Sequence, residues 1–387
     1  MGRGETFAHR GNVPSVHTNA ALLPAGGIPL VPRATVALVT GDDRCRNICR
    51  ALDLVADQID LSGKRQVFVK PNLVSTSFQP AATHVDALRA VLGFLRERYD
   101  GPITIGEGTG TPAAEGFANF GYAALAAEYG VTLADLNLGD WVTARAYDRR
   151  GQPFHVHLAR QVVESDFRIS VGPPKTHDCV IVTLSLKNMV MGSLFHEVPF
   201  GRAGEARGLL RTVYRRIPAG IKYSRLLEAL KRRVVTSVSS SDRVALHQDY
   251  ASHHLNLFLL APQVYPHLAV IDGFQGMEGD GPGAGDPVDW RTAIVSTDYV
   301  AADCLTARLM GFDLRDVAYL YYCQRAGLGT GDPEEMEIRG ERPEDCRRPF
   351  VPSPIHQKQM GWRVEARGLA PLAERVGLRP EWVTGDG

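Results

Sequence analysis

Short apolar runs rich in β-branched residues alternate along this chain with longer segments in which apolar residues recur at helical spacing. The short runs predict strands at residues 35–41, 66–69, 102–106, 131–135, 167–171 and 267–273. The amphipathic segments predict helices at residues 44–59, 85–98, 113–129 and 298–310. Alternation of this kind is typical of α/β proteins, so we expect a mainly parallel, twisted sheet with helices on both faces.

The same pattern divides the chain into three parts. Residues 1–33 lack periodicity and predict a flexible N-terminal arm, residues 34–330 predict the α/β domain, and the Pro- and Gly-rich residues 331–387 predict a wrapping C-terminal tail. Within the domain, residues 202–235 hold ten Lys or Arg and only two acids. We expect this segment to form a basic helical-hairpin insertion.

The composition excludes several classes of protein. Lysine plus arginine and aspartate plus glutamate both total 43, so no net field favours nucleic acid. No run of about 20 apolar residues predicts a membrane span, and residues 1–33 lack the apolar core of a signal peptide. The six cysteines are scattered without a Cys-x-x-Cys pair. We therefore expect a cytoplasmic protein without an iron–sulfur cluster.

The first candidate site residues follow the predicted strand at residues 66–69. Lys70 and Asn72 begin the loop after this strand, and Thr83 and His84 precede the next helix. Open α/β sheets bind ligands where their strands end. A lysine in such a loop offers a positive charge, or a base if burial lowers its pKa. A solvated turn lysine and a simple helix cap are the structural alternatives.

Residues 168–192 form the most specific stretch. Lys175 and His177 share the loop after one apolar run, Lys187 and Asn188 follow a second, and Gly192 allows close approach of the backbone. Two lysines and a histidine among apolar neighbours are costly unless they pair with acids or bind an anionic ligand. The apolar surroundings of these residues therefore favour a functional role over a structural one.

Acidic residues follow two other predicted strands. Glu107 lies in the sequence GEGTGTP, which matches neither the dinucleotide fingerprint nor the P-loop pattern. Its carboxylate would repel a phosphate, so we interpret Glu107 as an acid, a base or a metal ligand, with a structural turn as the alternative. Glu278 and Gly281 lie in a Gly-rich loop that brings carboxylates to the same sheet edge or coordinates a hard cation.

Several separate motifs carry a resemblance to a known family. In order along residues 35–312 they are VKPNLV, the following Thr-His, IGEG, PPKTH, TLSLKNMVMG, IDGFQGMEGDGPGAGDP and STDYVAADCLTARLMG. With these motifs the chain resembles the domain of unknown function 362 family. The resemblance implies that the candidate residues named above are motif positions, and it assigns none of them a role. Some family members are associated with a ferredoxin-like iron–sulfur module, whose cysteine cluster this chain lacks.

These residues predict one composite pocket at the carboxyl edge of the sheet. Our first hypothesis is an enzyme that acts on a small anionic metabolite by acid–base chemistry, as in isomerisation, elimination or group transfer. Its catalytic residues would be Lys175, His177, Lys70 and Glu107, and its substrate-binding residues Asn72, His84, Lys187, Asn188, Glu278 and Gly281. The alternatives are a divalent-metal-dependent enzyme and a non-catalytic module whose basic insertion binds an acidic protein. Apart from the divalent metal of the first alternative, the sequence indicates no cofactor.

Overall fold

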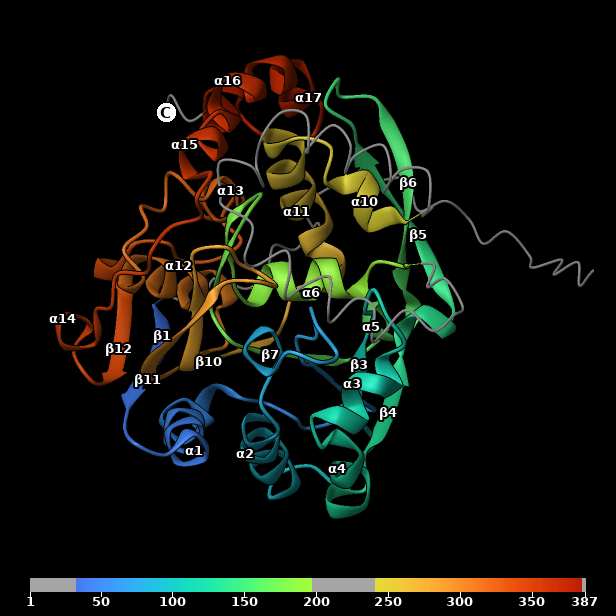
Figure 1. Ribbon diagram of the computed structural model, residues 1–387, viewed down its shortest axis with the longest axis vertical. Helices are drawn as coiled ribbons and strands as arrows, with labels where there is room; N and C mark the ends of the chain where they lie inside the picture. Colours follow the sequence, from blue (N-terminus) through green and yellow to red (C-terminus); the bar gives the residue numbers. More distant parts are fainter. Residues whose placement is uncertain (1–32, 197–240, 385–387) are drawn as a thin grey trace, which may run out of the picture.

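The computed structural model describes residues 33–196 and 241–384 of the chain. Its main sheet has ten strands, and eight of them lie in the order β12-β1-β11-β10-β7-β2-β3-β4 (Figure 1). Seven of these strands are β1 (Ala34–Thr40), β2 (Val67–Lys70), β3 (Ile103–Glu107), β4 (Thr132–Asp135), β7 (Phe167–Gly172), β10 (Leu268–Glu278) and β12 (Met336–Gly340). The eighth, β11 (Asp286–Ser296), runs antiparallel to both of its neighbours, whereas the other pairs along this path are parallel. The sheet is therefore mixed and mostly parallel, as the alternation of the sequence predicts.

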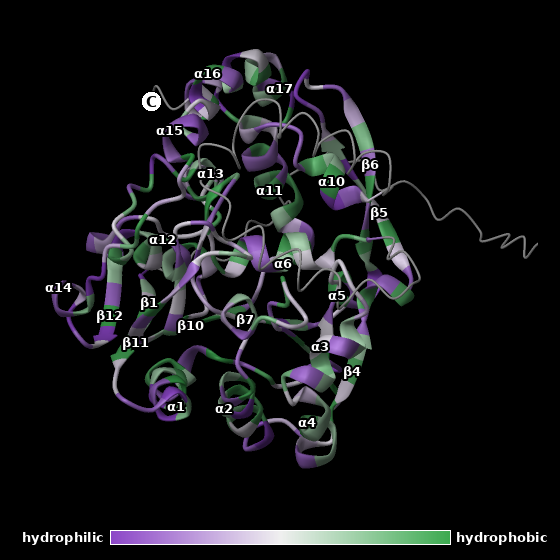
Figure 2. Cartoon of the chain, in the orientation of Figure 1, coloured by the Kyte–Doolittle hydropathy of each residue, from purple (hydrophilic) through white to green (hydrophobic). Residues whose placement is uncertain are grey.

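Helices cover both faces of this sheet and bury two separate hydrophobic clusters. Consecutive residues of β1 divide between them, since Val36 and Leu38 join one cluster and Ala37 and Val39 the other. One face is covered by α1 (Arg44–Leu54), α2 (Val85–Arg96) and α4 (Tyr122–Tyr129). The other is covered by α6 (Ser185–Ser193), α11 (Tyr250–Val264), α12 (Tyr299–Leu309) and α13 (Ala318–Arg325). Figure 2 shows hydrophobic and hydrophilic residues alternating around α1 and α2, the pattern that predicted them.

Two helices are shorter than their sequence patterns predict. The helix expected at residues 113–129 is divided into α3 (Ala113–Asn119) and α4, because Gly121 adopts a left-handed conformation with a φ of 77°. The helix expected at residues 44–59 ends at Leu54 and is followed by a separate 3₁₀ turn at Ala56–Gln58.

Four strands of the sheet were not predicted. Strand β8 (Lys175–His177) lies where we expected a loop, and β9 (Ile181–Thr183) pairs with it. The other two are β11 and β12. Strand β11 follows the Gly-rich loop and alternates in burial, with Val288 and Trp290 inside and Asp289 and Arg291 outside. Strand β12 comes from the segment that we expected to wrap the domain as a tail. It pairs in parallel with β1 and forms one edge of the sheet.

The remaining elements flank the sheet. Strands β5 (Trp141–Tyr147) and β6 (Pro153–Ala159) form a separate antiparallel hairpin. The shorter helices are α5 (Arg160–Val163), α10 (Asp242–Leu246), α14 (Pro343–Cys346), α15 (His356–Gln359), α16 (Trp362–Ala366), α17 (Ala370–Arg375) and α18 (Pro380–Thr384). The expected basic insertion at residues 202–235 and nearly all of the expected N-terminal arm lie outside the described residues. None of the helices within the described ranges is both long and apolar enough to cross a membrane.

The parallel strands bring several motifs to one edge of the sheet. Strand β2 ends at Lys70 and β3 at Glu107, while β7 ends at Gly172, just before Lys175. Strands β8 (Lys175–His177) and β9 (Ile181–Thr183) form a short hairpin that joins the sheet through β10. Helix α6 then packs against β7, β2 and β10, so its side chains reach the same edge.

Candidate active site

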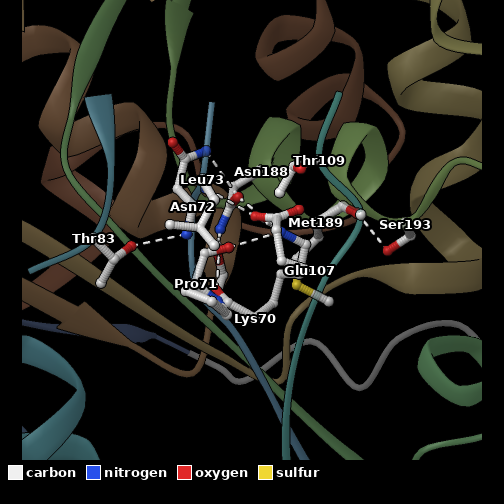
Figure 3. A network of polar contacts seen from close by, with 12 residues as sticks. Lys70, Pro71, Asn72, Leu73, Thr83, Glu107, Thr109, Asn188, Met189 and Ser193 are labelled. Atoms are coloured by element: carbon white, nitrogen blue, oxygen red, sulfur yellow. Dashed lines mark hydrogen bonds and ion pairs between the residues drawn. The ribbon is translucent and has the colours of Figure 1, made fainter. Parts of the chain in front are cut away.

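A buried ion pair lies at the centre of this edge. The Lys70 ammonium is 2.6 Å from Oε2 of Glu107, and both side chains are almost completely excluded from solvent. Lys70 Nζ also donates to the backbone oxygen of Pro71 at 2.7 Å and to Oδ1 of Asn188 at 3.3 Å (Figure 3). An ammonium has three N–H groups, so these acceptors use all of them. Burial lowers the pKa of Lys70 to about 8, although the Glu107 carboxylate counters this effect.

Two asparagine side chains extend the contacts of Lys70 across the sheet. Oδ1 of Asn188 accepts from Lys70 and, at 2.9 Å, from Nδ2 of Asn72. Nδ2 of Asn188 donates to the backbone oxygen of Lys70 and to the hydroxyl of Ser170. Each amide therefore has a defined orientation, with Oδ1 of Asn72 directed away from Asn188. We call Lys70, Asn72, Glu107, Lys175 and Asn188 the lysine–asparagine network.

Lys175 completes this network in a different way from Lys70. Its Nζ donates to Oδ1 of Asn72 and, at 3.0 Å, to the backbone oxygen of Ala81, and its side chain is fully buried. Neither acceptor is charged. Burial, with a further contribution from the Lys187 charge, holds the pKa of Lys175 well below its ordinary value. The predicted meeting of Lys70 and Lys175 at one sheet edge is confirmed, because Asn72 and Asn188 join them.

Helix α6 approaches the ion pair closely because position 192 lacks a side chain. A Cβ atom built on Gly192 would lie 2.2 Å from Cε of Lys70 and 2.8 Å from Oε1 of Glu107. The backbone oxygen of Gly192 also accepts a hydrogen bond from the amide of Gly108, which follows β3. The prediction that Gly192 allows close approach of the backbone is therefore confirmed.

Lys187 and His177 lie beside the network rather than within it. Lys187 directly precedes Asn188 on α6 and is 5% exposed. Burial lowers its pKa to about 8. His177 lies two residues after Lys175 on β8 and is also buried. Burial and the nearby Lys187 charge keep the pKa of His177 well below its ordinary value, so its imidazole is neutral.

Three other predicted residues have no hydrogen bond or ion pair to the network. Nδ1 of His84 accepts the Asp86 amide and caps α2. Glu278 accepts the backbone amide of Val351 at 2.9 Å. Gly281 packs against β8, where an added Cβ would lie 2.1 Å from the backbone oxygen of Thr176.

Asp303, to which the sequence assigned no site role, determines where α6 begins. This buried carboxylate of α12 accepts the Ser185 amide through Oδ1 and the Leu186 amide through Oδ2, both at 2.9 Å. Oδ1 also accepts the Ser185 hydroxyl at 2.6 Å. Burial raises the pKa of Asp303 to about 7, and these hydrogen bonds oppose the rise. No local signal in the sequence joins residues 118 positions apart.

Lys70 and Lys175 are fully buried, and the gap between Asn72, Ser170, Gly172 and Asn188 is too narrow for a water molecule. Among the described residues, no three His, Cys, Asp or Glu side chains are arranged to hold a metal ion.

Comparisons with known proteins identify a family and two distant structures. The chain matches the domain of unknown function DUF362 over residues 67–308. A search of curated proteins gives no match. The lactate racemase apoprotein from Thermoanaerobacterium thermosaccharolyticum shares 11% identity at a TM-score of 0.38, with 71% of this chain and 56% of that one covered. A protein from Thermotoga maritima shares 12% identity at a TM-score of 0.38, with 67% and 57% covered. This chain thus spans little more than half of either structure, and similarity at this level says nothing about a shared reaction.

Replacing Gly192 by alanine should destabilise the protein, because the new methyl group collides with the ion pair. Gly192→Ala should lower the free energy of unfolding by about 1–3 kcal/mol, measured by urea denaturation. Gly93 in α2 is the matched control, since a Cβ there meets nothing within 4 Å. Gly93→Ala should instead stabilise by about 0.5–1 kcal/mol. Equal changes in the free energy of unfolding at the two positions would contradict the close approach of α6 to the ion pair.

Replacing Asp303 by asparagine should weaken the start of α6. An amide accepts through one oxygen only, so either Ser185 or Leu186 loses its acceptor, at a cost of about 1–3 kcal/mol. Urea denaturation should be carried out above the pKa of Asp303, where the carboxylate is charged. Asp249, which caps α11 through one backbone amide, is the control. Asp249→Asn should cost only a few tenths of a kcal/mol.

Proposed function

Because the chain belongs to the DUF362 family, whose description assigns no reaction, we propose a function from the chemistry of the site itself. We propose an enzyme that moves a proton to or from a small anionic substrate, with Lys175 as the base. Isomerisation and elimination both begin with such a step, and group transfer uses it to activate a nucleophile. The proposal places this proton transfer at the lysine–asparagine network.

The two uncharged hydrogen-bond acceptors of Lys175 are the observation that carries this proposal. A neutral amine has two N–H groups and one lone pair. Asn72 and Ala81 accept the two N–H groups, so the lone pair remains free to take a proton. Lys70 differs because its three acceptors, one of them charged, hold it as an ammonium. Burial readily lowers the pKa of a lysine, and lysines with a lowered pKa serve as general bases in enzymes.

His177 supports the same reaction from the neighbouring position. Residues two apart on a strand face the same side, so β8 places Lys175 and His177 together. Nδ1 of His177 accepts the Cys179 amide at 2.8 Å, which leaves the proton of the neutral ring on Nε2. His177 is therefore a hydrogen-bond donor that polarises a substrate oxygen, rather than a second base.

The unpaired charge of Lys187 accounts for an anionic substrate. Glu107 compensates Lys70, and Lys175 is neutral in this proposal, so Lys187 is the lysine of this edge whose charge has no counter-ion among the described residues. Buried cations without partners are unfavourable unless a ligand compensates for them. A substrate anion beside Lys187 would supply that compensation.

Exchange of substrate protons with solvent tests the base directly. The protein should be incubated in D₂O with glycolate, pyruvate, malonate and alanine, and loss of carbon-bound protons should be followed by NMR. Lys175→Met should abolish any protein-catalysed exchange, because methionine keeps the volume but has no lone pair to accept a proton. Its stability cost should be about 1–3 kcal/mol, since only neutral acceptors lose their donor.

Lys70→Met is the matched comparison within the same network. It leaves the Glu107 carboxylate buried without its counter-ion, so the free energy of unfolding should fall by about 3–5 kcal/mol. Exchange by Lys175→Met at the wild-type rate would exclude Lys175 as the base. If none of the probes exchanges with the wild-type protein, carbon-bound protons of these acids are not its target.

The pH dependence of activity should have a high-pH limb near 8. The pKa values of Lys70 and Lys187 both lie at about 8, and the proposed reaction requires both ammonium groups. The value of kcat/KM for an exchanging substrate should therefore fall as pH rises through about 8. Lys187→Arg keeps a positive charge at position 187 through this pH range, whereas Lys70 still loses its proton. The substitution should therefore move the high-pH limb only partly toward higher pH. A profile that stays flat above this pH would show that neither ammonium is required.

A further inference from the structure

A second group of polar side chains lies next to Lys187 and outside the lysine–asparagine network. His177 on β8, His253 on α11, and His247, which precedes α11, have ring centroids 4.1–6.2 Å apart. Helices α6 and α11 pack side by side (Figure 1), and the Lys187 charge lowers the pKa of all three imidazoles. We call His177, His247, His253 and Lys187 the imidazole cluster.

Two of these imidazoles have an Nε2 atom without a hydrogen-bond partner among the described residues. Nδ1 of His253 lies 3.1 Å from Sγ of Cys179, and burial raises the pKa of that thiol well above its ordinary value. When the thiol donates to Nδ1, the proton of His253 lies on Nε2. Nε2 of His253 is buried and has no hydrogen-bond partner. Nε2 of His177 carries a proton for the same reason, because the Cys179 amide occupies its Nδ1.

Lys187 has no partner either. It is more than nine-tenths buried, and within the described residues its ammonium forms no hydrogen bond or ion pair. The carboxylates near the cluster are already engaged. Glu365 accepts two backbone amides at the start of α11, and Asp249 accepts the Ser252 amide. Asp178 has half of its side chain exposed to solvent.

The tautomers exclude the cluster as a set of three metal ligands. A histidine binds a metal through a nitrogen lone pair. The lone pair of His177 is on Nδ1, where it already accepts two backbone amides, those of Cys179 and Val180. His177 therefore offers a proton to a ligand and not a lone pair.

We propose that Lys187, His177 and His253 bind one carboxylate group of the substrate. This inference rests on the proposed function and deepens it, since it identifies the substrate oxygen that His177 contacts as part of a carboxylate. The ammonium and the two Nε2–H groups are unpartnered donors, and a carboxylate has two oxygens to accept them. His247 is exposed at the edge of the cluster, so the ligand enters from that side.

The charge of the cluster favours a carboxylate over a phosphate. One ammonium and two neutral imidazoles carry a single positive charge, which matches a monoanion. Phosphate sites commonly add free backbone amides at a helix N-terminus. The N-terminus of α6 is occupied by the Asp303 carboxylate, so it is not available for that purpose.

Titration of wild-type protein with acetate tests the proposal without turnover. Protein labelled with ¹⁵N at histidine should show shifts of the Nε2 resonances of His177 and His253 as acetate is added. Inorganic phosphate should produce much smaller shifts at the same concentration. Absence of acetate shifts at both histidines, or tighter binding of phosphate, would overturn the proposal.

Variants of Lys187 provide the second arm of the test. Lys187→Met should weaken acetate binding about 10- to 100-fold, whereas Lys187→Arg should retain most of it. Lys64, in a surface turn, is the control, and Lys64→Met should leave binding unchanged. Acetate binding without proton exchange would refute the proposed function and leave this subsite standing. Proton exchange that depends on Lys175, without acetate shifts, would refute this subsite and leave the proposed function standing.

Discussion

The buried pair of Lys70 and Glu107 is the interaction on which the rest of the site depends. Each charge is excluded from water, so neither tolerates loss of the other. The pair joins the ends of β2 and β3, and the third N–H of Lys70 reaches Asn188 on α6. The helix in turn approaches closely enough only because Gly192 has no side chain. One ammonium thus connects the ends of two strands with this helix.

The three lysines of this edge differ because their partners differ. Lys70 has a carboxylate partner, whereas Lys175 has two neutral acceptors and a pKa that burial holds well below its ordinary value. Lys187 forms no hydrogen bond or ion pair with the described residues. All three side chains are buried, so the acceptors around each one determine how strongly its charged form is stabilised.

The family match and the site coincide along the chain. The DUF362 region begins at residue 67, the start of β2, and ends at residue 308, within α12. It therefore contains every member of the network and also Asp303, whose carboxylate positions α6. Strands β1 and β12 lie outside this region and complete one side of the sheet. The matched region therefore contains the candidate site, and the flanking strands extend the sheet.

The sequence by itself determined the α/β class, most of the parallel strands and the edge where Lys70, Glu107 and Lys175 meet. These features depend on local periodicity and on the rule that parallel strands end together. Only the tertiary structure decided the state of each side chain. The amide of Asn188 joins Lys70 to Asn72, and Asp303 reaches α6 across 118 positions. The contact between His253 and Cys179 likewise joins distant segments, and no local pattern predicts it. Protonation depends on such distant neighbours and on exclusion of water, and neither is written in the local pattern of a chain.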